Sequence, residues 1–182
     1  GELNQIRTSA DDATIAGGYN GEIAEGSDFA VIGGGDSNYA SNNYATVGGG
    51  WLNVADGYGS TVAGGRRNHA NGDYAFAGAG RNNRAEEIGS TVAGGFSNVV
   101  SGVSSVIGGG ASNRVSSGYA AVLGGRNNDV KGDCSAILGG SGNTVTGLYG
   151  VIAGGVLNTV GKNDGVIGGG TANTVQGFLG VI

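Results

Sequence analysis

Apolar residues recur at two fixed positions of a 15-residue repeat, and small or polar residues fill most of the positions between them. Each repeat is numbered here from its asparagine as position 0. The pattern around position +9 alternates, which predicts a strand over +7 to +10, and a second short strand is expected over 0 to +3. Glycines at +11 and +12, and often at +4, predict the turns between the strands.

The two apolar columns form the predicted core. The +9 column contains Val47, Val62, Ala77, Val92, Ile107, Val122, Ile137, Ile152, Ile167 and Ile182. The +2 column contains Ala40, Ala55, Ala70, Ala85, Val100, Val115, Val130, Val145, Val160 and Val175.

An asparagine marks every repeat from residue 38 onward. Such a fixed period indicates a solenoid of stacked coils. A stacked amide can donate and accept hydrogen bonds between neighbouring coils and can hold backbone groups of the turns. We therefore expect a buried structural ladder rather than a ligand site. The ladder comprises Asn38, Asn53, Asn68, Asn83, Asn98, Asn113, Asn128, Asn143, Asn158 and Asn173.

Two short strands per repeat predict an all-β fold, a parallel β-roll with two sheets that covers residues 14–182. The length allows about 12 coils, and a spacing of about 4.8 Å gives a rod on the order of 55 Å long. A buried Val or Ile in either apolar column contributes roughly 1.5–3 kcal/mol. Because the +2 column changes from Ala to Val at Val100, a thinner core is expected in the first half.

The first part of the chain departs from the regular period. Ile15 and Ile32 occupy equivalent positions, but the interval between them is longer than one repeat, so this coil carries a two-residue insertion. Residues 1–13 do not match the repeat, and a partial coil, a cap and a disordered tail all remain open for them. The chain begins at Gly1 without Met and stops at Ile182 within a repeat, which predicts a segment of a longer protein.

One predicted strand carries no charge at all. In nine consecutive coils between residues 45 and 170, none of the residues at positions +7 to +12 is Asp, Glu, Lys or Arg. Successive side chains on a strand point to opposite faces, and a sheet that is apolar on both faces is usually buried on both. We therefore predict that this sheet packs against copies of itself. A monomer with a weakly polar Gly and Thr face is the alternative.

Composition excludes several classes of protein. The 43 glycines would suit a flexible linker, but they stand in fixed columns, which a linker does not need. A net charge of −5 with 13% charged residues argues against nucleic-acid binding. One cysteine, Cys134, and one histidine, His69, leave no internal disulfide, no metal cage and no expected cofactor. No serine sits in a nucleophile elbow, no phosphate loop or calcium loop is present, and no apolar run is long enough to insert into a membrane. We therefore expect no catalytic residues.

With these columns defined, the repeats show a specific resemblance. The segments YATVGGG at 44–50, STVAGG at 60–65 and NHANG at 68–72 resemble head repeats of trimeric autotransporter adhesins. These are the YadA-like heads, and the ubiquitous surface protein A heads have the same GGG-x-x-N spacing. The resemblance covers roughly residues 14–182. It implies a left-handed roll, a homotrimer, display on the bacterial cell surface in a fibre linked to virulence, and adhesion to a host matrix protein, receptor or glycan. The family's neck, heptad stalk and membrane anchor are absent from this sequence.

A cluster of aromatic and cationic residues is the candidate ligand-binding site. Residues at +13 in consecutive coils should stack about one strand spacing apart, and Trp and Arg are favoured at binding hot spots. The predicted patch comprises Trp51, Arg66, Arg67, His69, Arg81, Arg84 and Phe96. A docking site for an acidic glycan or protein is one interpretation, and a merely solubilising surface is the other.

A rod of stacked coils suits binding or spacing better than catalysis. The leading hypothesis is a non-enzymatic adhesive head that binds host or environmental ligands on its lateral face. A structural or receptor-binding segment of a phage or viral tail fibre, whose repeats are similar, is the first alternative. A self-assembling extracellular filament is the second. Ice binding is a distant one, because the threonines at +8 stop after Thr91.

Overall fold

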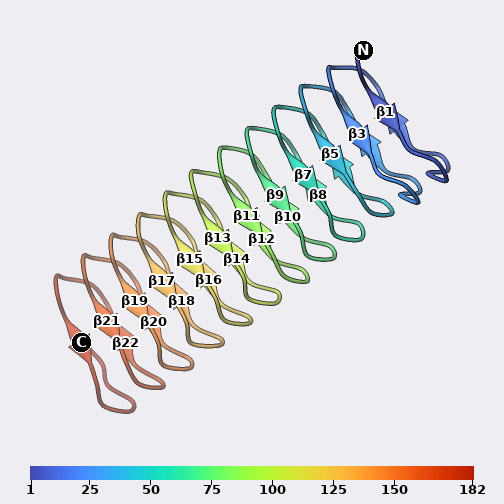
Figure 1. Ribbon diagram of the computed structural model, residues 1–182. Coiled ribbons are helices and arrows are strands. Elements are labelled where there is room, and N and C mark those ends of the chain that lie inside the picture. Colours follow the sequence, from blue (N-terminus) through green and yellow to red (C-terminus); the bar gives the residue numbers. More distant parts are fainter.

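The computed structural model describes residues 1–182 as a rod of stacked coils with strands and turns and no helix (Figure 1). Each coil contributes one two-residue strand to each of two sheets. The first sheet contains β1 (Gln5–Ile6), β3 (Glu22–Ile23), β5 (Tyr39–Ala40), β7 (Val54–Ala55), β9 (His69–Ala70), β11 (Arg84–Ala85), β13 (Val99–Val100), β15 (Arg114–Val115), β17 (Asp129–Val130), β19 (Thr144–Val145), β21 (Thr159–Val160) and β23 (Thr174–Val175). The second contains β2 (Thr14–Ile15), β4 (Val31–Ile32), β6 (Thr46–Val47), β8 (Thr61–Val62), β10 (Phe76–Ala77), β12 (Thr91–Val92), β14 (Val106–Ile107), β16 (Ala121–Val122), β18 (Ala136–Ile137), β20 (Val151–Ile152) and β22 (Val166–Ile167).

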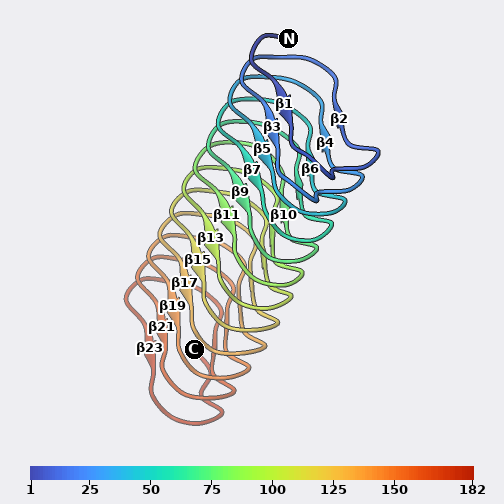
Figure 2. The same cartoon turned by 45° about the vertical axis from the view of Figure 1, so that its right-hand side comes forward.

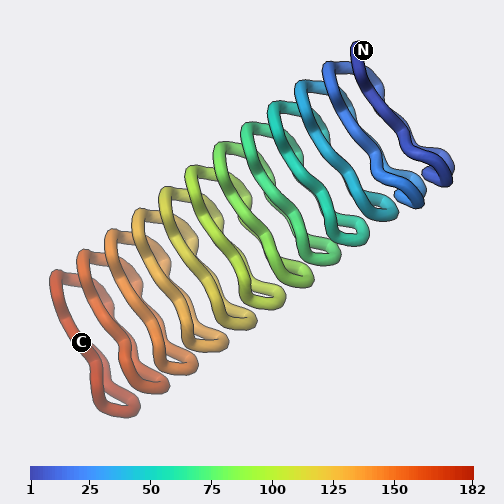
Figure 3. Tube along the Cα trace, viewed as in Figure 1, coloured from blue at the N-terminus to red at the C-terminus, as the bar shows by residue number.

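Every strand pairs in parallel with its equivalent in the next coil. From β5 onward each strand residue pairs with its counterpart one repeat later, as Ala55 does with Ala70. A third column of single bridges runs beside the two sheets at position +13. The two sheets run side by side along the whole rod (Figure 2), and the chain trace repeats almost unchanged from coil to coil (Figure 3).

The predicted class and repeat are confirmed: the protein is an all-β parallel roll with a period of about 15 residues. The number of coils differs slightly from the prediction, since the sheets of 12 and 11 strands make about eleven complete turns rather than about 12. The strands are also shorter than expected. Only +8 and +9 are regular strand, although the +7 carbonyl and the +10 amide still bond between coils, as in Gly48 N–H to Val62 O at 2.9 Å.

The first two coils are wider than the others. Gln5 pairs with Glu22 and Glu22 with Tyr39, and each of these intervals is longer than one regular repeat. The two extra residues lie in the turn that follows the first strand of the coil, which explains why residues 1–13 do not match the repeat. Of the possibilities left open for that segment, the structure has a coil: β1 pairs with β3, and Glu2 bridges to Tyr19.

The core is a single continuous cluster built from three columns. The +2 and +9 side chains are fully buried along nearly the whole rod. Position +7, which was not predicted as core, is also buried and holds Ala, Ser or Gly. In the last three coils, where +7 is Gly, a methyl group of the +2 Val fills the space that a +7 side chain would need: a Cβ on Gly150 would lie 2.6 Å from Val145 Cγ1. The predicted thickening of the core is therefore partly offset in the last three coils.

Each coil turns through three residues with left-handed backbone, at positions +6, +12 and +14. Tyr44, Gly50 and Leu52 have φ angles of 61°, 94° and 53°. Position +12 is always glycine, whereas +6 and +14 often hold large side chains, for which this conformation costs about 1–2 kcal/mol. The N–H groups at +6 and +14 donate to carbonyls of the preceding coil, as in Leu52 N–H to Asp36 O at 3.0 Å. The N–H groups of the strands donate to carbonyls of the following coil. Each coil is thus bonded in both directions.

The asparagine ladder holds the turns together from within. The Asn128 amide donates to the carbonyl of Gly124 in its own coil at 3.0 Å and to that of Gly140 in the next coil at 3.1 Å. Its Oδ1 accepts the backbone N–H of Asn143 at 3.0 Å. One buried side chain therefore satisfies three backbone groups, and the same pattern repeats along the ladder. Asn4, which was not predicted, accepts the N–H of Gly21 in the same way at 2.8 Å.

We expect the substitution Asn128→Ala to lower the free energy of unfolding by about 3 kcal/mol. The carbonyl of Gly124 and the N–H of Asn143 would lose their partner, while the Gly140 carbonyl would keep the N–H of Arg126 at 2.9 Å. Each unsatisfied buried group costs about 1–3 kcal/mol, less where water can enter. Urea denaturation followed by circular dichroism measures the effect. Asn173→Ala is the matched control, because this half-buried amide makes a single hydrogen bond, to Gly169 O. Equal losses in the two variants would contradict a cooperative role for the ladder.

A second, interrupted ladder of Asp and Asn side chains follows the turn at position +5. There a side-chain oxygen accepts the N–H of the equivalent residue in the preceding coil, as Asp73 does from Tyr58 at 2.9 Å. The recurrence of Asp and Asn at this one turn position is a sequence signal for the ladder, which was not predicted. The members are Asp28, Asn43, Asp73, Asp133 and Asn163.

Candidate ligand-binding groove

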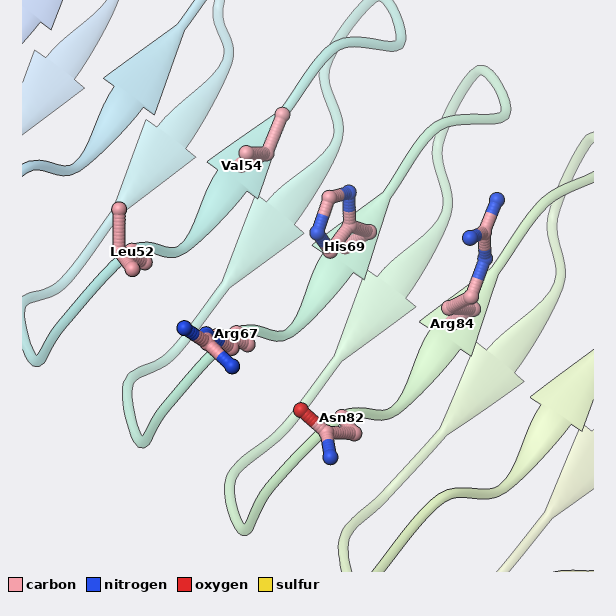
Figure 4. Close-up of a pocket in the computed structure, with 6 residues that line it drawn as sticks. All are labelled: Leu52, Val54, Arg67, His69, Asn82 and Arg84. Carbon is pink, nitrogen blue, oxygen red and sulfur yellow. The ribbon is translucent and has the colours of Figure 1, made fainter.

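A shallow groove of about 460 Å³ lies on the outer surface of the first sheet, over coils in the first half of the rod. Two rows of side chains line it along the rod axis (Figure 4). Residues at +14 form one row and residues at +1 form the other. The lining residues are Leu52, Arg67 and Asn82 in the first row and Val54, His69 and Arg84 in the second.

The fold explains why both rows face outward. Val54, His69 and Arg84 open strands β7, β9 and β11 and pair directly with one another. Since the next residue of each strand points into the core, these side chains point to the opposite face. In the other row, the left-handed backbone directs the side chains away from the core, with φ of 54° at Arg67 and 58° at Asn82.

The +13 column runs beside the groove and carries the rest of the predicted patch. Trp51, Arg66, Arg81 and Phe96 are neighbours in one bridge ladder, as the spacing predicts. The guanidinium carbon of Arg66 lies 4.2 Å from the centre of the Trp51 ring, and that of Arg67 lies 5.1 Å from it. Arg81 lies over Phe96 at 4.5 Å. Each such exposed contact contributes roughly 0.5–1 kcal/mol and holds the cation in place.

The cations of this region are largely free of carboxylate partners. The ion pairs in the structure join Arg7 to Glu22, Arg84 to Glu86 and Lys131 to Asp129. Arg66, Arg67 and Arg81 therefore lack a salt bridge, although the chain carries a net charge of −5. Two adjacent coils thus present four guanidinium groups, and aromatic or aliphatic side chains border them on both sides along the rod.

His69 lies between the cationic residues and is half-buried. Burial is the main cause that lowers its pKa below the usual 6.5, and the neighbouring charge of Arg84 lowers it further. Asp56 and Glu86 act in the opposite direction but do not cancel the shift. The imidazole is therefore neutral at pH 7 and offers one donor and one acceptor to a ligand.

This shift predicts a dependence of stability on pH. Well above pH 6.5 the imidazole is neutral in both the folded and the unfolded state and contributes nothing to the pH dependence. As pH falls below 6.5, the unfolded chain binds the proton more readily, so the free energy of unfolding decreases until pH passes the lower pKa of the folded state. The His69→Gln variant should lose less stability between pH 7.5 and pH 5.0 than the original chain does. Urea denaturation at both pH values measures this, and parallel changes in the two proteins would show that His69 makes no contribution.

The structure divides the predicted patch into two neighbouring parts. It brings Arg67, His69 and Arg84 together in the groove, while the side chains of the +13 column form its border. Leu52, Val54 and Asn82 also line the groove and were not predicted. The sequence alone does not show that side chains at +14 lie beside those at +1 on the same face of the rod. The asparagine ladder lies beneath the groove and is buried, so its side chains do not face a ligand.

The outer face of the second sheet is the other notable surface. Its side chains at +8 and +10 carry no charge, and several large apolar ones are exposed in the single chain, including Leu123 at 56% and Leu138 at 46%. A row of rings borders the turn that leads into this sheet. Phe29 stacks on Tyr44 with centroids 5.1 Å apart, and Tyr58 and Tyr74 continue the row edge to face. This row was not predicted.

Comparison with known proteins gives no family for the chain. None of the protein-family models matches the sequence, and neither does any curated protein. Without helices, the structure also contains no helical segment suited to crossing a membrane. Function must therefore be inferred from the fold and from the two surfaces described above.

Proposed function

We propose that this chain is the non-enzymatic adhesive head of a bacterial surface fibre, a left-handed β-roll that assembles as a homotrimer and binds ligands on its lateral face. The observation that carries the proposal is the uncharged outer face of the second sheet, which exposes Leu123, Leu138 and Val106 in the single chain. Monomeric proteins rarely leave a large apolar patch exposed. Packing of three copies through these faces would bury it.

The geometry of the rod supports adhesion on the opposite side. The groove lies on the first sheet, so a trimer joined through the second sheets leaves it accessible. Three identical grooves around one rod would act together, and linked sites increase avidity far beyond the affinity of one site. The resemblance of the repeats to trimeric autotransporter heads supports the same proposal, together with extracellular display at the cell surface.

A structural segment of a phage or viral tail fibre is the second candidate. The regularity of the coils favours it, because the ladder continues almost unchanged over the length of the rod whether or not a groove is present. The concentration of unpaired arginines in two coils favours the adhesive head, since a purely structural shaft has no need of such a cluster.

Adhesion of protein-coated beads tests the proposal. Beads that carry the full chain are expected to bind cultured epithelial cells or their extracellular matrix. A variant with Trp51→Ala and Arg81→Ala should bind roughly thirtyfold more weakly, since two hot-spot side chains of about 1 kcal/mol each would be lost. Adhesion that is absent in the original chain, or unchanged in the variant, would count against a lateral binding face.

A further inference from the structure

We propose that the groove binds an acidic oligosaccharide, a sugar of about two residues that bears a sulfate or carboxylate group. This inference rests on the proposed adhesive function and names the class of ligand for that site. It depends on four features of the groove, which are its charge, its mixture of side chains, the state of its backbone and its length.

The two arginines that line the groove favour a ligand with an oxyanion group. Arg67 and Arg84 stand in opposite rows and in adjacent coils (Figure 4). In the free chain Arg67 lies over Trp51 and Arg84 pairs with Glu86, and rotation of both exposed side chains toward the groove would let an anion bind between them. Arg67 has no carboxylate partner, and Arg84 uses its Nε for Glu86 at 2.7 Å, which leaves the terminal nitrogens of its guanidinium group. Guanidinium groups bind planar or tetrahedral oxyanions through paired hydrogen bonds.

The remaining side chains suit a sugar ring. Leu52 and Val54 form an apolar end of the groove, where the C–H face of a pyranose can pack. His69 and Asn82 are neutral polar groups, and each provides both a donor and an acceptor for hydroxyl groups. A simple inorganic anion would use only the arginines and would leave these four side chains without a role.

The backbone excludes β-strand addition, which is one way in which a protein binds an extended peptide. The amides of Val54, His69 and Arg84 each donate to the next coil at 2.9 Å, and the amide of Arg67 donates to the preceding coil at 2.9 Å. No free strand edge is therefore available for a peptide to extend. A ligand of the groove must therefore be recognised by side chains.

The dimensions set the length of the ligand. Each row of the groove spans three coils, and two spacings of about 4.8 Å make about 10 Å. This is the length of a disaccharide. The volume of about 460 Å³ lies within the range of small-ligand sites. The cations are also interrupted beyond the groove, because Ser97 and Val99 follow Asn82 and Arg84 in the two rows. Arg114 follows Val99 in the +1 row, so the cations are densest at the groove but are not confined to it.

Binding of three probes to the full chain tests the proposal. The probes are a heparin-derived oligosaccharide, which carries sulfate and carboxylate, a hyaluronan oligosaccharide, which carries carboxylate alone, and oligoglutamate, which is an acidic peptide. We expect one or both saccharides to bind and oligoglutamate to bind at least tenfold more weakly. Binding of heparin alone assigns sulfate, and binding of both saccharides assigns carboxylate. Oligoglutamate that binds as well as the saccharides overturns the proposal.

Two matched double variants separate a groove from a general effect of charge. Arg67→Ala with Arg84→Ala should weaken saccharide binding at least tenfold. Arg114→Ala with Arg126→Ala removes the same charge from the +1 and +13 columns farther along the rod and should leave binding within about twofold, as expected of distant rim charges. Equal weakening in both variants, or no saccharide binding at all, overturns the proposal. Thermal melting of each variant shows that it is folded.

The outcome distinguishes this inference from the function on which it rests. Beads that adhere to cells and lose adhesion in the Trp51 and Arg81 variant, while no saccharide binds, would leave the adhesive head in place and remove the acidic sugar. Absence of adhesion together with saccharide binding would retain the groove as a sugar site and remove the adhesive head.

Discussion

Replacing Gly125 with alanine is expected to destabilise the roll by at least about 4 kcal/mol, the largest effect of any single substitution considered for the isolated chain. Gly125 occupies position +12 with φ of 90°. A Cβ placed there would overlap the carbonyl oxygen of Gly140 in the next coil and lie 2.7 Å from the amide nitrogen of Asn128. The substitution therefore combines backbone strain with loss of ladder hydrogen bonds.

The neighbouring residue provides a control for this prediction. A Cβ on Gly124 meets nothing within 4 Å, so Gly124→Ala adds one methyl group to the same turn without a clash. Urea denaturation of the two variants should show a large loss for Gly125→Ala and a change within about 0.5 kcal/mol for Gly124→Ala, as for an ordinary surface substitution. Similar stabilities would mean that the coils can move apart enough to accept a side chain at +12.

Placing an aspartate in the centre of the apolar face is expected to abolish assembly. Ala136 lies in β18 with its side chain outward, and Ala136→Asp would bring a carboxylate from each copy into the proposed interface. Burial of an unpaired charge costs several kcal/mol, so association should weaken by more than about a thousandfold. The single chain should remain folded, because position 136 is only partly buried within it.

Native mass spectrometry and sedimentation across a dilution series measure this effect. Thr159→Asp in β21 is the matched control, since it introduces the same charge on the outer face of the other sheet, between Thr144 and Thr174, and should leave the assembly intact. A monomeric original chain at all concentrations would remove the proposed trimer. Equal assembly of the original chain and the Ala136→Asp variant would place the interface elsewhere on the rod.

The periodic features of the fold were predictable because each depends on residues that recur. Val62, Ala70 and their equivalents form the core, and the asparagines lie one above another beside the turns. The two parallel sheets follow from these columns. The missing charges identified the second sheet as the surface with an apolar outer face.

Other features had no local signal. The left-handed backbone at Tyr44 and Leu52 contradicts the preference of these residue types and is held by the hydrogen bonds that their N–H groups donate to the preceding coil. The coil built from residues 1–13 was hidden because the wider turns of the first two coils shift the register. The groove was only half predicted, since Leu52 and Asn82 enter it through the same unusual backbone conformation.

Bonding in both directions between coils has a mechanical consequence. Tension applied along the rod crosses every junction between coils in turn, so each junction bears the whole force and the weakest fails first. At a junction such as that between Ile88 and Val103, the turn lacks the additional side-chain tie that Asp73 gives its neighbour. A stretched rod should therefore lengthen in discrete steps that begin at such junctions, and each step would release about one coil of chain while the rest stays folded.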